Sequence, residues 1–295
     1  MNSAASVLGM KQKVLCILAV SVMFITGAVS PLFAYSPHLK MGNPSGATSD
    51  QSDKDNFLME KDYFALSYND SKGTPNWVSW QLTKDDLGTA PRKPFYPDKD
   101  LPEGFKKVTP KDYVGGGFDR GHMCPHSDRA ADDDTSTATF VMTNIIPQSP
   151  HVNQKAWDQL EIYCRDLVEN HRKTLYIVSG PAGKGGKGRK GAKETLAAGK
   201  VTVPATCWKV IMVLDAKRGN DLKKVNDTTR LIAVIMPNDM TVGYDWGDYR
   251  VSVKEVEELS GYKFFDKVPS SIIDSLKEEV DEERIPPPVI PRRGN

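Results

Sequence analysis

The sequence predicts an α+β domain in which helices flank a mixed or antiparallel sheet. The 295 residues have an ordinary globular composition, with 39% hydrophobic and 26% charged residues. Short runs of β-branched and aromatic residues are interspersed with segments of helical periodicity, which is typical of this fold class. The formal net charge of +1 neither favours nor excludes a nucleic-acid partner, because a basic cleft can be balanced by acidic patches elsewhere.

The N-terminus predicts export. Lys11 and Lys13 precede an apolar run from Val14 to about Phe33, and Ala34 is a small residue at a suitable cleavage point. This pattern is typical of a secretory signal peptide over residues 1–34, which predicts a secreted or periplasmic protein. An uncleaved membrane anchor is the alternative, because the run is nearly long enough to span a bilayer. Glycine, serine and proline within the run favour cleavage.

Composition divides the remaining chain into three parts. Residues 35–56 are rich in serine, glycine, proline and aspartate, which predicts a flexible leader. The folded domain is expected over 57–270. Residues 271–295 are expected to form a C-terminal helix and a proline-rich tail.

The domain begins with a predicted hairpin. Tyr63–Tyr68 and Trp77–Leu82 are strand-like runs, and the polar segment Asn69–Pro75 between them is a turn signal. Residues 84–117 are rich in proline, lysine and glycine and predict an irregular connection that contains Arg92.

A helix is predicted from Asn153 to about Asn170, because apolar residues recur there at spacings of three and four. Further strands are expected at Thr174–Ser179, Val201–Leu214 and Arg230–Met236.

Two features complete the predicted fold. The segment Ser252–Glu255 is a capping box that opens a helix ending near Gly261, and a last helix begins near Ser270 or Ser271. The glycine- and lysine-rich segment 183–200 predicts a flexible loop.

Cleavage of the signal peptide removes Cys16 and leaves three cysteines, Cys124, Cys164 and Cys207. In an oxidising compartment one disulfide and one free thiol are possible, and Cys164 with Cys207 is the first pair to test. Three buried, reduced thiols are the alternative.

The segment Phe118–His126 carries the strongest chemical signal. Side chains two apart in an extended segment point to the same face, so Arg120 and His122 should face one site. A guanidinium suits phosphate, and an imidazole can hold or release a proton near neutral pH.

The predicted helix adds a candidate metal ligand. The amide oxygen of Asn153 is a hard ligand that suits Mg²⁺, which keeps most of its water; a helix-capping role is the alternative. Glu161 and Arg165 lie four residues apart on the same helix and can border one cleft with Asn153, although a surface ion pair would also explain them.

Zinc is a second metal hypothesis. His122, Cys124 and His126 alternate at two-residue spacing and could face one ion. The spacing does not match a common zinc finger or ribbon, and no second ligand pair follows downstream.

Together these segments resemble the DNA/RNA non-specific endonucleases, the ββα-metal group that includes mitochondrial endonuclease G. The resemblance covers about residues 57–270, and its main motifs are Asp119–His122, Thr143–Gln148, Asn153–Trp157, and Glu161 with Arg165. It implies a ββα-metal active site within the α+β fold.

The resemblance also implies roles for individual residues. His122 matches the general base that activates water, and Asn153 matches the one protein ligand of the metal. Glu161 is similar to the acid that holds water around that metal. The implied cofactor is Mg²⁺, with Mn²⁺ as an alternative.

Four more residues take roles from the same resemblance. Asn144 is similar to an asparagine that supports the site by hydrogen bonding. Arg165 matches a cation that stabilises phosphoryl charge, and Arg92 is its counterpart from the preceding loop. Arg120 is assigned to site structure or phosphate contact.

The expected activity is hydrolysis of DNA and RNA to 5′-phosphate and 3′-hydroxyl ends, with recognition through the phosphate backbone. One alternative is a catalytically silent nucleic-acid-binding protein that uses the basic segment 184–190. Another is a phosphodiesterase that acts on a different substrate.

Overall fold

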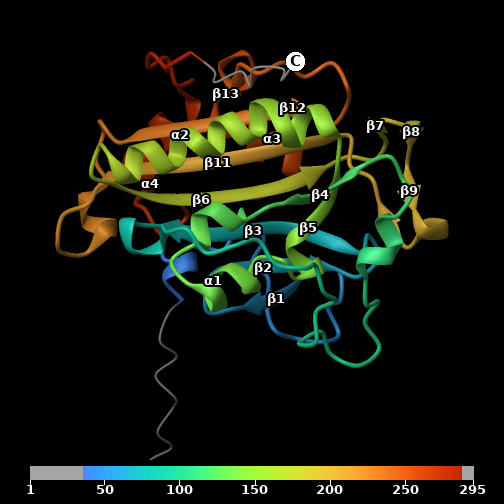
Figure 1. Ribbon diagram of the computed structural model, residues 1–295. Coiled ribbons are helices and arrows are strands. Elements are labelled where there is room, and N and C mark those ends of the chain that lie inside the picture. The colour runs from blue at the N-terminus through green and yellow to red at the C-terminus, as the bar shows by residue number, and fades with distance from the viewer. Residues whose placement is uncertain (1–35, 288–295) are drawn as a thin grey trace, which may run out of the picture. The chain divides into compact units, whose positions relative to one another are not determined.

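The computed structural model describes residues 36–287, which form a seven-stranded sheet whose neighbouring strands are all antiparallel (Figure 1). The predicted fold class is therefore confirmed. In spatial order the strands are β1 (Phe57–Glu60), β2 (Ala65–Asn69), β3 (Thr74–Leu82), β6 (Lys173–Ala182), β11 (Thr206–Asp215), β12 (Arg230–Pro237) and β13 (Arg250–Val251).

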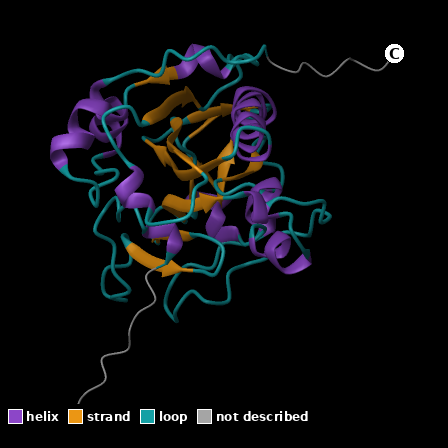
Figure 2. Ribbon diagram, turned by 90° about the vertical axis from the view of Figure 1, so that its left-hand side faces the viewer, coloured by secondary structure: helices purple, strands orange, loops and turns teal. Residues whose placement is uncertain are grey.

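Helices cover both faces of the sheet, as Figure 2 shows. Alternate residues of β11 belong to two separate cores: Ile211 packs in the core that contains α2 (Trp157–Glu169), and Val210 packs in the core that contains α3 (Val253–Ser260) and α4 (Ser270–Glu278). Because both faces are buried, the strand is apolar almost throughout instead of alternating with polar residues.

A ββα unit is inserted between two neighbouring strands of this sheet. β3 pairs with β6, and the intervening chain forms β4 (Asp119–His122), β5 (Ile145–Gln148) and α2. β4 and β5 pair with each other and belong to no larger sheet, with His122 opposite Ile145. The short helix α1 (Asp133–Ala138) lies between them in sequence. The chemical motifs of the sequence all fall within this unit.

Local sequence signals identified several elements correctly. The predicted first hairpin is β2 and β3, and the predicted strands around residues 174 and 230 are β6 and β12. In α3, Ser252 Oγ accepts from the Glu255 N–H at 3.2 Å and the Glu255 carboxylate accepts from the Ser252 N–H at 2.7 Å. Gly261 ends α3 with a φ of +76°, a left-handed conformation that favours glycine.

The prediction of a flexible leader over residues 35–56 is wrong for the part that the structure describes. Leu39, Met41 and Ala47 are buried in the core beside α3 and α4, and Trp77 Nε1 donates to Ser45 Oγ at 2.8 Å. A few apolar residues spaced among polar ones are enough to bind this segment to the sheet. The domain therefore begins before residue 57.

The domain also extends beyond residue 270, because Ile273 and Leu276 of α4 are buried in the same core. The predicted signal peptide, residues 1–34, lies outside the described residues. Over residues 36–287, no helix combines the length and the apolar character needed to cross a membrane.

The prediction of a flexible loop over residues 183–200 is also wrong. This segment contains the hairpin of β7 (Gly186–Gly188) and β8 (Gly191–Lys193), and β9 (Thr195–Leu196), which pairs with β10 (Val201–Thr202). Its glycines allow close backbone packing. A Cβ on Gly188 would lie 2.3 Å from the Gly117 carbonyl oxygen.

All three described cysteines are buried and free, so the alternative of three reduced thiols describes this structure. Burial raises the pKa of Cys164 and of Cys207 to about 12, and raises the pKa of Cys124 as well. The thiol next to the candidate base is therefore unionised at neutral pH.

Candidate active site

His122 ends β4, and its imidazole forms a cluster with two aromatic rings that also contact each other. Its ring centroid lies 5.2 Å from that of Phe95 and 5.0 Å from that of Phe140, and the residue is 8% exposed. Burial first, and then the charges of Arg92 and His126, lower the pKa of His122 to about 3. The buried Nε2 has no hydrogen-bond partner among the described residues. The ring is thus neutral at physiological pH, with a nitrogen free to accept a proton.

We expect the His122 ring of the free protein to stay neutral from pH 8 down to below pH 5. Its folded-state pKa lies below the ordinary value of 6.5, so protonation favours the unfolded chain. The free energy of unfolding therefore decreases as the pH falls from 6.5 towards 3. Histidine ring resonances followed by NMR, with His122→Asn for assignment, measure this directly. Titration of His122 near pH 6.5 would show that the ring is hydrated.

Arg92 and Arg120, two of the predicted site residues, contact the same two aromatic rings as His122. Arg92 Cζ is 5.3 Å from the centre of the Phe140 ring, and Arg120 Cζ is 5.2 Å from that of Phe95. Arg120 Nη2 also donates to the Pro110 carbonyl at 3.1 Å. Arg120 and His122 therefore share one side of β4, and Arg92 reaches the same place from the irregular connection.

Asn153 lies in a widened helical turn, Val152–Ala156, that leads into α2. The turn departs from α-helical geometry at Lys155, and the Ala156 N–H donates at 3.2 Å to the carbonyl of Gly243, which lies outside the helix. Such turns are frequent at functional sites. The amide of Asn153 does not cap the helix: its Nδ2 donates to Asp119 Oδ2 at 3.0 Å. The capping alternative is therefore wrong.

This contact decides which side of the Asn153 amide is available to a ligand. The Asp119 carboxylate only accepts hydrogen bonds, and it receives Nδ2 of Asn153 and, at 2.6 Å, Nε2 of Gln154. Oδ1 of Asn153 is left free, and the residue is partly exposed. A neutral amide oxygen beside a carboxylate suits a divalent cation that keeps most of its water. The residues present thus fit a hydrated Mg²⁺ or Mn²⁺.

The zinc hypothesis does not fit. Nε2 of His126 lies 3.0 Å from the Ala90 carbonyl, and Cys124 is fully buried with a raised pKa. Within residues 36–287 no three histidine, cysteine or acidic side chains come together as a metal site.

Glu161 and Arg165 occupy the same helix but form their closest ion pairs with other residues. Glu161 Oε1 lies 3.5 Å from Lys209 Nζ, and Arg165 Nη1 lies 3.1 Å from Asp128 Oδ1. Asp128 is buried and also accepts from Trp80 Nε1 at 3.0 Å. The surface ion pair that the four-residue spacing suggested is therefore replaced by two pairs that hold each side chain separately.

Lys209 is the site residue that the sequence reasoning missed. It is 1% exposed in β11, with its Nζ 4.2 Å from the centre of the Trp157 ring. Burial raises the pKa of Glu161 to about 7, and Lys209 and then Arg165 oppose that rise. The available signal was one lysine in the otherwise apolar run Cys207–Leu214.

We expect Lys209→Met to lower activity by about tenfold at pH 7 and to be partly rescued at pH 9. Removing the cation raises the pKa of Glu161 above about 7, so the carboxyl becomes protonated at neutral pH and ionises only in alkali. Met fills similar volume, and Lys209→Arg keeps the charge as a control. The pH–rate profiles of the three proteins provide the measurement. If the acid limb of the Lys209→Met profile lies at the same pH as that of the wild type, Lys209 does not control the ionisation of Glu161.

Asn144 lies behind the site. Its Oδ1 accepts from the Cys124 N–H at 2.9 Å, and its Nδ2 donates to the carbonyls of Cys124 and Thr139. It is fully buried. Asn144 thus fixes the chain that follows His122 and has no access to a substrate.

Two structural links join the predicted residues. Asp119, which holds Asn153, lies three residues before His122 on β4, a distance of about 10 Å along a strand. The pKa of His126 is lowered first by burial and also by the charges of both Arg92 and Arg165. The charge of Arg165 on α2 therefore acts on His126, which contributes to the lowered pKa of His122.

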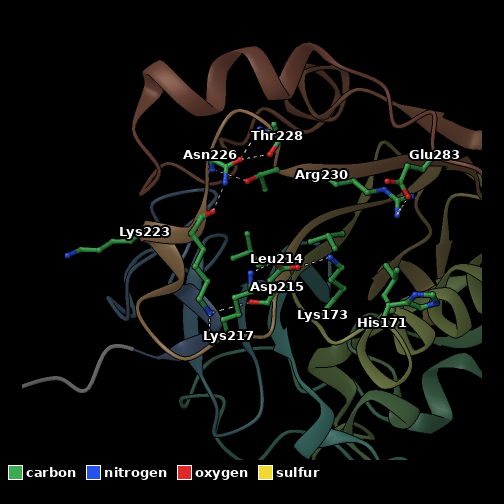
Figure 3. A pocket seen from close by; sticks show the side chains of 14 residues that line it. His171, Lys173, Leu214, Asp215, Lys217, Lys223, Asn226, Thr228, Arg230 and Glu283 are labelled. Carbon is green, nitrogen blue, oxygen red and sulfur yellow. Dashed lines mark hydrogen bonds and ion pairs between the residues drawn. The ribbon is translucent and has the colours of Figure 1, made fainter.

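A separate hollow of about 650 Å³ lies at the start of β6 and the end of β11 (Figure 3). None of the predicted site residues lines it. Most of its cations form ion pairs: Lys173 and Lys217 share Asp215, at 2.8 and 3.1 Å, and Lys224 pairs with Asp221 at 2.6 Å. Lys223 points away from the other labelled side chains. This hollow is not the candidate site.

Comparisons with known proteins show the family of this chain. The family model of the DNA/RNA non-specific endonucleases matches residues 42–271. A nuclease of Nostoc sp. is 47% identical over 262 residues, which are 87% of this chain and 92% of that protein. The human mitochondrial nuclease EXOG is 33% identical over 210 residues, 68% of this chain and 55% of the human protein.

A solved structure shows the same fold. A chain in a crystal structure of the EndoG/EndoGI complex aligns with a TM-score of 0.63 and 24% identity, over 80% of this chain and 92% of that one. The protein is a hydrolase of the nuclease class and belongs to the DNA/RNA non-specific endonuclease family.

Proposed function

We propose that this protein is an exported endonuclease that requires Mg²⁺, or Mn²⁺ in its place, and hydrolyses DNA and RNA without sequence preference. One observation carries the proposal. Asp119 turns the Asn153 amide so that its oxygen is free, and the same strand ends in the neutral imidazole of His122. A hard ligand and a base are thus held on one rigid unit.

His122 supplies the base. Its Nε2 lacks a partner within residues 36–287, so in the complex with substrate a water molecule held beside it would lose a proton to the ring while attacking phosphorus. The bond from phosphorus to the 3′ oxygen would break, and that oxygen would take a proton from solvent. The hydrogen bonds of Asn144 to Cys124 hold the chain that follows. The products would carry 5′-phosphate and 3′-hydroxyl ends.

Positive charge stabilises the reacting phosphate. When bound, a divalent cation on Asn153 would neutralise phosphoryl charge. Arg92 and Arg120 lie over the two aromatic rings that contact His122, and Arg165 is held by Asp128. Glu161, whose ionised form is favoured by Lys209, can accept hydrogen bonds from water near the site.

The substrate class follows from the kind of groups present. The candidate residues are cations, amides, one carboxylate and one imidazole, which suit phosphate and metal, and we assign none of them to the reading of base edges. Binding through the backbone predicts little sequence preference and strong sensitivity to salt. The name of the matched family, DNA/RNA non-specific endonuclease, supports both nucleic acids as substrates.

Export is proposed from the sequence alone. The basic and apolar segments before Ala34 suit a cleaved signal peptide, so the mature protein would act outside the cytoplasm, secreted or in a periplasm. N-terminal sequencing of the protein from the culture medium and from the periplasmic fraction tests the cleavage point.

Supercoiled plasmid tests the proposed reaction. With Mg²⁺ the purified protein should convert it to nicked and linear forms, and a chelator should stop the conversion. RNA should be degraded under the same conditions, and small nucleotide diesters show whether a polymer is needed. Binding without nicking would favour the catalytically silent alternative and overturn this proposal.

A further inference from the structure

The hairpin of β7 and β8 concentrates positive charge on a nearly neutral protein. Residues 184–194 contain five cations and one carboxylate, a net charge of +4, whereas the whole chain has +1. Lys184 pairs with that carboxylate, Glu194, at 3.0 Å. Lys187, Arg189 and Lys190 are exposed, and no carboxylate of residues 36–287 pairs with them.

Main-chain contacts fix this hairpin to the chain that enters the candidate site. The Arg189 N–H donates to the Gly117 carbonyl at 2.8 Å, two residues before Asp119. Gly117 has a φ of +87°, and a Cβ there would lie 2.8 Å from the Lys190 nitrogen. Glycines at 117 and 188 thus let the two backbones touch, which places the cations beside β4.

A second anchor ties the hairpin to β5. The Lys187 N–H donates to the Asn238 carbonyl at 2.9 Å. The side chain of Asn238 in turn donates to the Pro147 carbonyl at 3.0 Å and accepts from the Ser149 N–H at 2.6 Å. The hairpin therefore rests on both strands of the ββα unit.

We infer that the β7–β8 hairpin is a docking surface for the nucleic-acid backbone outside the reacting centre. The inference rests on the proposed function and adds to it the surface that holds the substrate. Gly117 lies two residues from Asp119, or about 7 Å along an extended chain, so the hairpin cations reach phosphates a few nucleotides from the scissile one. Exposed, unpaired cations on a fixed hairpin suit phosphates without reading sequence.

The salt dependence of DNA binding tests this inference. Each phosphate contact contributes about 0.9 to the slope of log affinity against log salt concentration. The triple variant Lys187→Gln, Arg189→Gln, Lys190→Gln should reduce the magnitude of that slope by about 2 to 3 and weaken binding at least about tenfold at 0.1 M salt. Fluorescence anisotropy with a 30-base-pair duplex in EDTA measures it without cleavage.

The chain offers a control with the same change in charge. Lys217, Arg218 and Lys223 are exposed in the segment after β11, at the opposite end of that strand from the hairpin (Figure 1). The 10 residues of β11 separate its two ends by about 30 Å. Their triple glutamine variant should keep the wild-type slope. An unchanged slope in the hairpin variant, or an equal reduction in both variants, would overturn the inference.

The test of the hairpin and the test of the proposed nuclease activity can fail independently. Plasmid nicking by the wild-type protein tests the nuclease activity, whatever the hairpin does. Because all three replaced side chains are exposed, the hairpin variant should keep the wild-type melting temperature, and the single variants Arg189→Gln and Lys190→Gln should each lower the slope by about 0.9.

Discussion

His122→Ala should lower kcat for plasmid nicking by about 10²–10⁴-fold, the range that a positioned general base contributes. The reason is that the ring is neutral and its Nε2 has no other partner, so proton acceptance is the one reaction for which it is prepared. DNA affinity should change much less, because the arginines near the ring remain. Single-turnover rates measured with saturating Mg²⁺ separate these effects.

Two further variants guard this result against a folding artefact. His122 is buried against Phe95 and Phe140, so alanine leaves a cavity, whereas His122→Asn retains part of the polar volume. His171→Ala removes an imidazole whose side chain is 59% exposed and should leave the rate unchanged. Activity within about threefold of wild type in a folded His122→Asn protein would eliminate this residue as the base.

Asn153→Ala should lower the nicking rate at least about 100-fold, comparable with the loss of groups that hold a catalytic metal. The substitution removes the free Oδ1 but little core volume, since the side chain is partly exposed. The fold should persist, and the Mg²⁺ concentration that gives half-maximal activity should rise. Rates measured across a Mg²⁺ titration, with the melting temperature as the fold control, test both expectations.

Gln154 provides a matched control for Asn153. Its Nε2 donates to the same Asp119 oxygen, at 2.6 Å, but it is exposed and is not the proposed ligand. Gln154→Ala should therefore cost far less than Asn153→Ala. Equal losses would mean that Asn153 acts only through Asp119, and full activity in Asn153→Ala would remove it from the metal site.

The parts of the fold that follow from local chemistry could be predicted from the sequence. The capping box at Ser252 and the left-handed Gly261 mark the two ends of α3. The turn between β2 and β3 and the apolar run of β6 are also signals contained in short segments. Each of these depends on neighbours in sequence.

The two wrong predictions of flexibility have a common cause. Composition indicates whether a segment resembles a loop, but it does not show which surface the segment can meet. Leu39 and Met41 find an apolar surface beside α3 and α4, and Gly188 finds the backbone of Gly117. These partners are distant in sequence, so polar or glycine-rich composition was misleading.

The site shows the same division. The resemblance assigns the roles of His122 and Asn153 from short motifs. The contact between Asn153 and Asp119 spans 34 residues. Lys209 reaches Glu161 from β11, which follows α2 much later in the chain. No motif or regular element in the irregular segment fixes the position of Arg92 from the sequence. Its packing on Phe140 places it near His122. Such contacts require the folded chain.

A crystal structure of the wild-type protein with Mn²⁺ and a 5′-phosphorylated oligonucleotide, the proposed product, tests the central claim most directly. The account predicts one anomalous peak about 2.1 Å from Asn153 Oδ1, with the terminal phosphate between that ion and the imidazole of His122. An ion bound away from Asn153, or a phosphate that cannot reach His122 while the ion holds it, would contradict the account.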